Sequence, residues 1–267
     1  MSKGDNGKDW AVILGASSGF GAATARRLAA DGMNVIGVHL DRRGTMPLVE
    51  AVRADIEAAG SEAHFFNSNA AQDDARAEVI GEISQIFAES GDRVRVLLHS
   101  LAFGNLLPYV SDEEHAAIST AQMEMTFNVM AHSLVYWSRD LVEAGLMGEG
   151  GRIYAMTSAG NNRIWPHYGA VSAVKSTLDA HVRRLAFELA SRRITVNSIR
   201  AGVTDTPALR RIPGNDELID HAQRVNPSGR LTTPEDVAAA ISALAAPETH
   251  WITGNIIGTD GGEDLAG

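Results

Sequence analysis

Cysteine is absent from this chain of 267 residues. Its absence excludes disulfide bonds, thiolate nucleophiles and cysteine-based zinc sites, and we expect a reducing compartment, the cytoplasm. Long apolar runs are absent too, since none reaches the roughly 18 residues of a membrane span. The N-terminal stretch MSKGDNGKDW is polar and lacks the apolar core of a signal peptide, so we expect residues 1–9 to form a mobile tail.

Basic residues are in deficit. Lysine and arginine number 23 against 33 aspartates and glutamates, which gives a formal net charge of −10. Broad binding to nucleic acid or to an anionic membrane needs a basic face, so we expect neither as a partner. Hydrophobic residues make up 45% of the chain, which is enough for a large buried core.

Short apolar runs alternate with amphipathic stretches of ten or more residues. The runs predict strands over 10–16, 34–40, 62–69, 94–100, 151–158, 194–202 and 253–262. The stretches between them predict helices over 22–32, 47–60, 75–91, 113–145, 168–191 and 233–246, and the long helix over 113–145 could be broken. This order is typical of βαβ units, so we expect residues 10–267 to form a single Rossmann-like, doubly wound α/β domain. Its sheet would be mostly parallel, with about seven strands and helices on both faces.

The turn between the first strand and the first helix reads GASSGFG and contains Gly15, Gly19 and Gly21. Glycines at such a turn let the backbone approach a pyrophosphate, and the helix N-terminus offers free N–H groups to the anion. The turn therefore predicts a dinucleotide site, with a plain structural turn as the alternative.

The end of the second strand, VHLDRRG, bears on the choice of cofactor. His39 stands where an acid would bind the ribose of NAD, and Arg42 and Arg43 follow, as a 2′-phosphate would require. This favours NADPH, unless the two arginines are only solvated loop charges. Asp41 is an acid two positions after His39, so NADH stays an alternative cofactor.

The stretch WPHYGAVSAVK holds a tyrosine and a lysine at the start of a predicted helix. Tyr168 and Lys175 are seven positions apart, so they fall on nearly the same helix face, about two turns from each other. They are candidates for a phenol and an ammonium that face one cavity. The alternatives are a helix-start aromatic packed on Trp165 and Pro166, and a surface lysine.

These features resemble the short-chain dehydrogenase/reductase family over nearly the whole chain. The resemblance implies catalytic roles for Ser158, Tyr168, Lys175 and Asn128, although Asn128 could be structural and Ser158 could only complete a strand hydrogen bond. It implies that the cofactor contacts Gly15, Ser17, Ser18, Gly19, Phe20, Gly21, His39, Arg42, Arg43, Asn69, Ala70, Ser100, Leu101, Ala102, Lys175, Gly202, Thr204 and Thr206. His99, His167 and His181 have no obvious acid partner or metal spacing, and we expect no metal.

One position departs from the family pattern. The usual tyrosine lies four residues before the lysine, where this chain has Val171. The Tyr-x6-Lys spacing is similar to the enoyl-acyl-carrier-protein reductases within the family, as are LLHSLAFG at 97–104 and Ala201 before Gly202. The glycine turn and Ser158 are closer to a smaller branch of those reductases. The resemblance therefore implies reduction of the 2,3 double bond of an enoyl thioester, as in fatty-acid synthesis.

Residues 203–230, rich in proline, glycine and charge, follow the sixth predicted strand, and the resemblance implies that they form a flexible flap over the substrate. Phe103, Tyr168, Leu209 and Ile212 would line an acyl pocket. Arg210 and Arg211 could attract an acyl carrier protein or coenzyme A. The resemblance also implies a homotetramer. Two other functions stay open: a carbonyl reductase or alcohol dehydrogenase, and a non-catalytic nucleotide-sensing protein.

Overall fold

The structure confirms the predicted parallel sheet of seven strands. The structure is a computed structural model that describes residues 7–113 and 116–266. Its strands are β1 (Asp9–Leu14), β2 (Asn34–His39), β3 (Ala63–Asn67), β4 (Arg93–His99), β5 (Arg152–Ser158), β6 (Thr195–Ala201) and β7 (Ile256–Thr259). They form a seven-stranded sheet in the order β3-β2-β1-β4-β5-β6-β7, and each neighbouring pair is parallel. Residues 1–6 of the predicted tail lie outside the described residues, and β1 already begins at Asp9.

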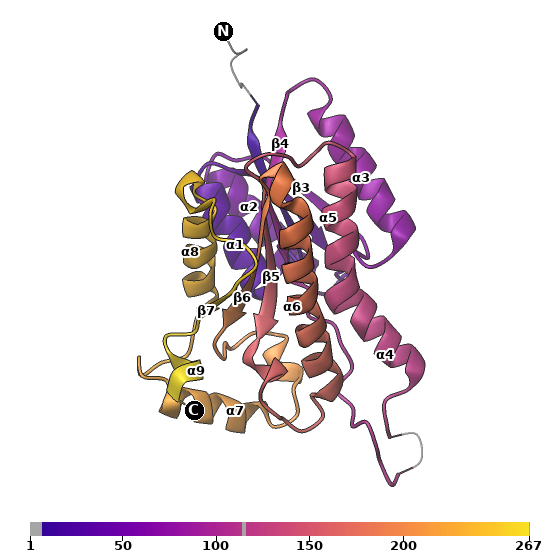
Figure 1. The fold of residues 1–267 in the computed structure, drawn as a ribbon, viewed down its shortest axis with the longest axis vertical. Coiled ribbons are helices and arrows are strands. Elements are labelled where there is room, and N and C mark those ends of the chain that lie inside the picture. Colours follow the sequence, from indigo (N-terminus) through magenta and orange to yellow (C-terminus); the bar gives the residue numbers. More distant parts are fainter. Residues whose placement is uncertain (1–6, 114–115, 267) are drawn as a thin grey trace.

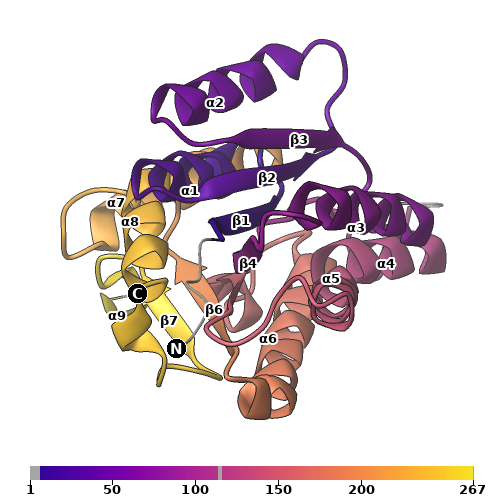
Figure 2. The ribbon, with the colours of Figure 1, turned by 90° about the horizontal axis from the view of Figure 1, so that it is seen from above.

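Helices cover both faces of this sheet (Figures 1 and 2). They are α1 (Gly19–Ala30), α2 (Met46–Ala58), α3 (Asp73–Phe87), α4 (Thr120–Phe127), α5 (Ser133–Glu143), α6 (Gly169–Leu189), α7 (Asn215–Val225), α8 (Pro234–Leu244) and α9 (Glu263–Ala266). Residues of α1, α2 and α8 share one buried apolar cluster with the sheet, and residues of α3, α5 and α6 share the other. The single Rossmann-like domain is thus confirmed. No helix of the described residues is long and apolar enough to cross a membrane.

The predicted helix over 113–145 is wrong in its start, and the break that the sequence left open is present. Residues 114–115 lie outside the described part, and helix α4 begins only at Thr120. Ser119 caps it: its hydroxyl accepts from the backbone N–H of Gln122, whose side chain accepts from the N–H of Ser119. A π-helical segment, Asn128–His132, then separates α4 from α5.

Two other boundaries differ. Strand β7 covers only Ile256–Thr259 of the predicted 253–262, and α9 after it was not predicted. Helix α8 lies within the predicted 233–246; Thr233 caps it by accepting from the N–H of Asp236, and Pro234 opens the helix.

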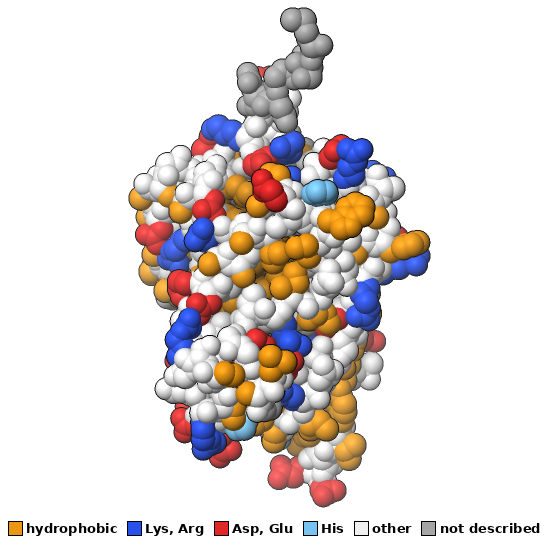
Figure 3. Space-filling model, turned by 60° about the vertical axis from the view of Figure 1, so that its left-hand side comes forward, with side chains coloured by type: hydrophobic (Ala, Val, Ile, Leu, Met, Phe, Trp, Pro, Cys, Tyr) orange, Lys and Arg blue, Asp and Glu red, His pale blue; other side chains and the backbone are white. Residues whose placement is uncertain are grey.

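Large apolar side chains stay exposed around β7 and the end of α6. Trp251 is 88% exposed, Phe187 75% and Ile256 41%. Figure 3 brings the α8 and β7 side forward and shows hydrophobic side chains grouped across the middle of that face.

Candidate active site

A cavity of about 640 Å³ opens at the carboxyl ends of β1, β4, β5 and β6. Helices α7 and α9 lie across this end of the molecule (Figure 1). In an open parallel sheet this is the edge where ligands bind. The cavity is lined by most of the predicted site residues: Gly15, Ser17, Ser18, Gly19, Phe20, Ser100, Leu101, Ala102, Phe103, Ser158, Tyr168, Lys175, Gly202, Thr204, Thr206, Leu209 and Ile212.

The turn before α1 forms one end of the cavity. Gly15 has a positive φ of 88°, and a Cβ there would lie 2.5 Å from the carbonyl oxygen of Ser100, so the turn requires glycine. Ser18 precedes α1, and its side chain makes no capping hydrogen bond. The first N–H groups of α1 therefore lack a side-chain partner beside the cavity. This arrangement fits a dinucleotide pyrophosphate.

The predicted ribose site at the end of β2 lies outside the cavity lining. His39 is buried, and its Nδ1 lies 3.1 Å from Asp41 Oδ2. Burial raises the pKa of Asp41, but hydrogen bonds with Thr45, Ser17 and His39 outweigh it and the pKa is lowered overall. Arg42 and Arg43 are exposed, and neither guanidinium has a hydrogen bond or ion pair within the described residues.

The Tyr168 phenol lies where α6 begins, and it is partly buried against the core. Gly160 packs against its ring, since a Cβ at that position would come 2.5 Å from Tyr168 Cε1. Burial raises the pKa of the phenol, and a hydrogen bond with the Ser158 side chain lowers it. The Ser158 hydroxyl also accepts from the N–H of Gly160 at 3.0 Å. Serine and tyrosine thus meet at one point of the cavity wall.

Lys175 is buried, with 6% of its surface exposed, and its Nζ donates to the carbonyl oxygen of Met156 at 2.6 Å. Burial lowers the pKa of this ammonium to about 8, and the charge of Asp179 opposes that effect. Lys175 is therefore a buried side chain whose Nζ has a hydrogen-bond partner in the protein. The surface alternative for Lys175 is wrong, because the side chain points into the core at the end of β5.

The other predicted site residues do not line the cavity. They are Gly21, His39, Arg42, Arg43, Asn69, Ala70 and Asn128. The Asn128 amide donates to the carbonyl oxygen of Ala71 at 3.0 Å, and Asn69 accepts from the N–H of Ala71 at 3.1 Å. Asn128 thus ties the π-helical segment to the loop after β3, which matches the structural alternative for this residue.

Among the histidines that the structure describes, the only one in the cavity wall was not predicted. His99 is fully buried with Nε2 2.8 Å from Ser133 Oγ, and burial lowers its pKa to about 3. His132 and His181 contact each other at 3.0 Å, and His167 is exposed. His221 on α7 lines the cavity. Within the described residues no cluster of three or more ligating side chains could hold a metal.

Charged residues that sequence reasoning missed also line the cavity, and they come from distant segments. Arg163 donates to Asp264 at 3.1 Å, and Glu263 accepts from the N–H of Val203 at 3.0 Å. Burial raises the pKa of Glu263. Since α9 carries Glu263 to the cavity and Asp264 to Arg163, only the tertiary fold reveals these contacts.

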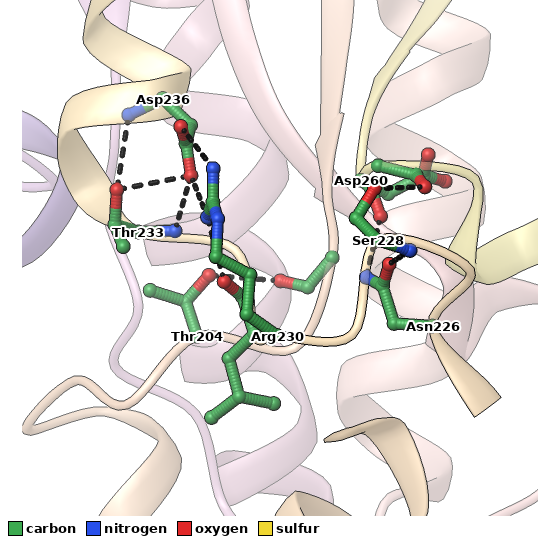
Figure 4. Close-up of polar contacts among 10 residues, drawn as sticks. Thr204, Asn226, Ser228, Arg230, Thr233, Asp236 and Asp260 are labelled. Atoms are coloured by element: carbon green, nitrogen blue, oxygen red, sulfur yellow. Dashed lines mark hydrogen bonds and ion pairs between the residues drawn. The ribbon is translucent and has the colours of Figure 1, made fainter. Parts of the chain in front are cut away.

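The flap, residues 203–230, is hydrogen-bonded to the rest of the molecule near its end and in its middle. Near its end, Asn226 donates to the carbonyl oxygen of Asp260, and Ser228 donates to that of Gly261, both at 3.0 Å (Figure 4). Figure 4 also shows Arg230 directed at Asp236, the residue that completes the α8 cap. In its middle, the indole N–H of Trp165 donates to the carbonyl oxygen of Pro213 at 3.0 Å. The flap thus forms part of the cavity wall.

Comparison with known proteins supports one family and several activities. A family model described as "Enoyl-(Acyl carrier protein) reductase" matches residues 15–263. An NADH-dependent enoyl-acyl-carrier-protein reductase, FabI, from Nostoc sp. is 33% identical over 66% of each chain. The 3beta-hydroxysteroid dehydrogenase 1 of Eggerthella lenta is 30% identical over 95% of this chain and 93% of its own. The solved reductase LugOII, which catalyses a keto-reduction, superposes with a TM-score of 0.83 at 26% identity and covers 98% of this chain and 99% of its own.

Proposed function

The chain belongs to the short-chain dehydrogenase/reductase family, and from this premise we propose that it reduces the 2,3 double bond of an enoyl thioester with a nicotinamide cofactor. One observation carries the proposal. The phenol at the cavity is that of Tyr168, while the position four residues before Lys175 presents the apolar side chain of Val171 to the same cavity. The proton donor is therefore displaced along α6.

That displacement suits a conjugated thioester. When bound, the reduced nicotinamide would supply a hydride to the β-carbon. The electron pair of the double bond would then move towards the thioester carbonyl oxygen, three bonds from the β-carbon, and a proton taken up at the α-carbon would complete the reduction. Tyr168 donates a hydrogen bond to that oxygen and stabilises the enolate. The raised pKa of the phenol keeps it protonated for this task at neutral pH.

Three further groups support this step. The Lys175 ammonium would bind the nicotinamide ribose and add positive charge near Tyr168. A hydrogen bond to the carbonyl oxygen of Met156 already holds its Nζ near the end of β5. Ser158 orients the phenol through its hydroxyl. Thr204 and Thr206, at the start of the flap, would contact the carboxamide and phosphates. Phe103, Leu209 and Ile212 give the cavity an apolar wall for the acyl chain.

A spectrophotometric assay tests the proposal. NADPH and NADH oxidation are followed with crotonyl-CoA, with a longer enoyl thioester and with a panel of ketones. We expect turnover of the enoyl thioesters. Brisk ketone reduction without any enoyl turnover would replace this proposal with the second candidate.

The second candidate is carbonyl reduction. It is favoured by the contact between Ser158 and Tyr168, which would also serve a substrate whose carbonyl carbon receives the hydride. The resemblance to a steroid dehydrogenase and to a keto-reductase adds to it. Nucleotide binding without turnover of either class would point to the non-catalytic alternative.

For the cofactor we propose NADPH. Just beyond β2, the guanidinium groups of Arg42 and Arg43 have no partner among the described residues, as recognition of a 2′-phosphate requires. NADH stays the rival, because the Asp41 carboxylate interacts with Ser17 of the first turn. Dissociation constants for both cofactors, in the natural protein and in Arg42→Ala/Arg43→Ala, decide between them. A double variant that weakens NADPH binding no more than NADH binding would contradict this proposal.

For the thioester carrier we propose a phosphopantetheine group, on acyl carrier protein or coenzyme A. The flap arginines differ in their partners: Arg210 pairs with Asp205 and Asp216, whereas Arg211 lines the cavity with no such partner in the described chain. Arg211→Ala should therefore raise KM for a CoA thioester, with Arg210→Ala as the matched control. Equal effects of the two would count against this role.

A further inference from the structure

Asp179 is a buried carboxylate that the chemistry above does not use. It lies on α6, one turn after Lys175, and is only 3% exposed. Its Oδ1 accepts from the Ser198 hydroxyl at 2.7 Å. Its Oδ2 accepts from the Asn161 amide at 2.8 Å and from the Thr157 hydroxyl at 3.1 Å. A carboxylate buried this deeply needs such donors, because it has lost the hydrogen bonds that water would give it.

The donors connect Asp179 to the segment that holds the reacting groups. Thr157 lies between Met156, whose carbonyl oxygen receives the Lys175 ammonium, and Ser158, whose hydroxyl meets the phenol. Asn161 ends the short 3₁₀ helix that follows Ser158, and Ser198 belongs to the neighbouring strand β6. One side chain of α6 is thus bonded to the end of β5, to the turn beyond it and to β6.

The charge of Asp179 matters as much as its hydrogen bonds. All three donors are neutral, so none cancels the negative charge. The titratable groups that face Lys175 are Asp179 from α6, His99 from β4 and the Tyr168 phenol from the start of α6. His99 and Tyr168 are neutral near pH 7, because burial lowers the pKa of the first and raises that of the second. Among the described residues, Asp179 is therefore the counter-charge of the buried ammonium.

We propose that Asp179 is a positioning residue for the reaction: it fixes the end of β5 against α6 and supplies the negative charge that accompanies the buried Lys175 ammonium. The proposal rests on the role of Lys175 in the proposed function. It does not depend on which substrate the cavity takes, because the same lysine and strand end would serve an enoyl thioester or a ketone.

The lysine content of the chain makes a direct test practical. There are three lysines, Lys3, Lys8 and Lys175. Protein labelled with ¹³C at the lysine ε-carbon therefore gives three side-chain signals in an NMR titration, and Lys175→Met identifies the one that matters. Ion pairing with Glu62 raises the pKa of Lys8, so its signal titrates far from that of Lys175 and serves as an internal reference.

We expect Lys175 to titrate near pH 8 in the natural protein, and about one unit lower in Asp179→Asn. Ser198→Ala is the matched control, because it removes one hydrogen bond and keeps the carboxylate; its Lys175 midpoint should stay where it was. An unchanged midpoint in Asp179→Asn would overturn the proposal, and so would an equal shift in Ser198→Ala. If Asp179→Asn does not fold, Asp179→Ser takes its place with the same expectation, since its hydroxyl oxygen still accepts.

Kinetics test the positioning itself. Asp179→Asn should lower kcat about tenfold or more, and the high-pH limb of its pH profile should move down with the Lys175 midpoint. Because the NMR titration needs neither substrate nor turnover, a wrong substrate class and a wrong role for Asp179 give different results. A kcat limb that stays in place while the lysine midpoint moves would overturn the assigned link to the reaction.

Discussion

At the scale of single residues, the chemistry of the cavity depends on which position before Lys175 carries the tyrosine. Val171 occupies the position of the usual family tyrosine and lines the cavity with a side chain that cannot donate a proton. Tyr168 reaches the same cavity from the start of α6. The proton donor is thus moved by nearly one helical turn relative to the lysine, and this shift underlies the proposal of a conjugated thioester.

The first prediction is that Tyr168→Phe lowers kcat by about 10²-fold or more. The change removes only the hydroxyl that stabilises the developing charge, so KM should move little. The assay is NAD(P)H oxidation with crotonyl-CoA. Tyr136→Phe is the control, because it makes the same change at a ring that contacts Arg76, away from the cavity. Equal activity of Tyr168→Phe and the natural protein would remove Tyr168 from the mechanism.

The second prediction is that burial of the Lys175 ammonium destabilises the folded protein. Burial lowers its pKa to about 8 in the folded protein, from the ordinary lysine value of 10.5. The unfolded chain therefore binds more protons between pH 8 and 10.5, and the stability of the folded state rises with pH across that window. Below pH 8 the burial cost is present in full. Lys175→Met should therefore raise Tm at pH 7 by roughly 3–8 °C while abolishing activity.

Thermal melts at several pH values check this prediction. The difference in Tm between Lys175→Met and the natural protein should shrink as the pH rises from 8 to 10.5. A difference that is constant across this range would mean that the lysine is not destabilised by its burial.

Sequence reasoning finds residues of this site only where local spacing places them. Tyr168 and Lys175 could be paired because one helix carries both. Glu263 and Arg163 could not, since they reach the cavity from α9 and from the loop after β5, far apart in the chain. Asp179 was overlooked for the same reason: its donors belong to β5, β6 and the turn after β5, so only the folded packing reveals its role.

At the scale of elements, the flap and the loop before α6 act together. The Trp165 indole donates to the carbonyl oxygen of Pro213 in the flap, and Tyr168 follows three residues later in the same loop. His167, between them, has a positive φ of 62°. The loop that delivers the phenol is therefore also the loop that contacts the flap.

The third prediction is that Trp165→Phe raises the substrate KM by about fivefold, since one hydrogen bond contributes about 1 kcal/mol to the closed flap. Phenylalanine keeps the aromatic contact and loses only the N–H. Limited proteolysis should cleave within residues 203–230 faster in this variant. Trp251→Phe, at an exposed tryptophan outside the cavity, is the control. Unchanged KM and unchanged cleavage would show that the contact does not hold the flap.

Strands could be predicted better than helix ends. A parallel strand buried on both faces reads as a continuous apolar run, so β1, β2, β4, β5 and β6 were found nearly in full. The start of α4 was missed, although Ser119 and Gln122 form a readable capping box. The π-helical segment has no such local pattern, and its position depends on packing between α4 and α6.

At the scale of the whole molecule, β7 leaves an open edge on the sheet. Within the described residues it pairs only with β6. Beside it stand the exposed side chains of Phe187, Trp251 and Ile256. Exposed apolar groups next to an unpaired strand edge are a favourable surface for association, so this face supports the expected homotetramer.

The fourth prediction is that Trp251→Glu dissociates the oligomer. A buried carboxylate without a partner would cost several kcal/mol at such an interface, so the sedimentation velocity should fall from that of a tetramer to that of a smaller species. Leu48→Glu on α2 is the control, because it places the same charge at a half-exposed leucine away from this face and should leave the tetramer intact.

A natural protein that sediments as a monomer at micromolar concentration would contradict the tetramer. Dissociation by both variants would mean that the contact lies elsewhere.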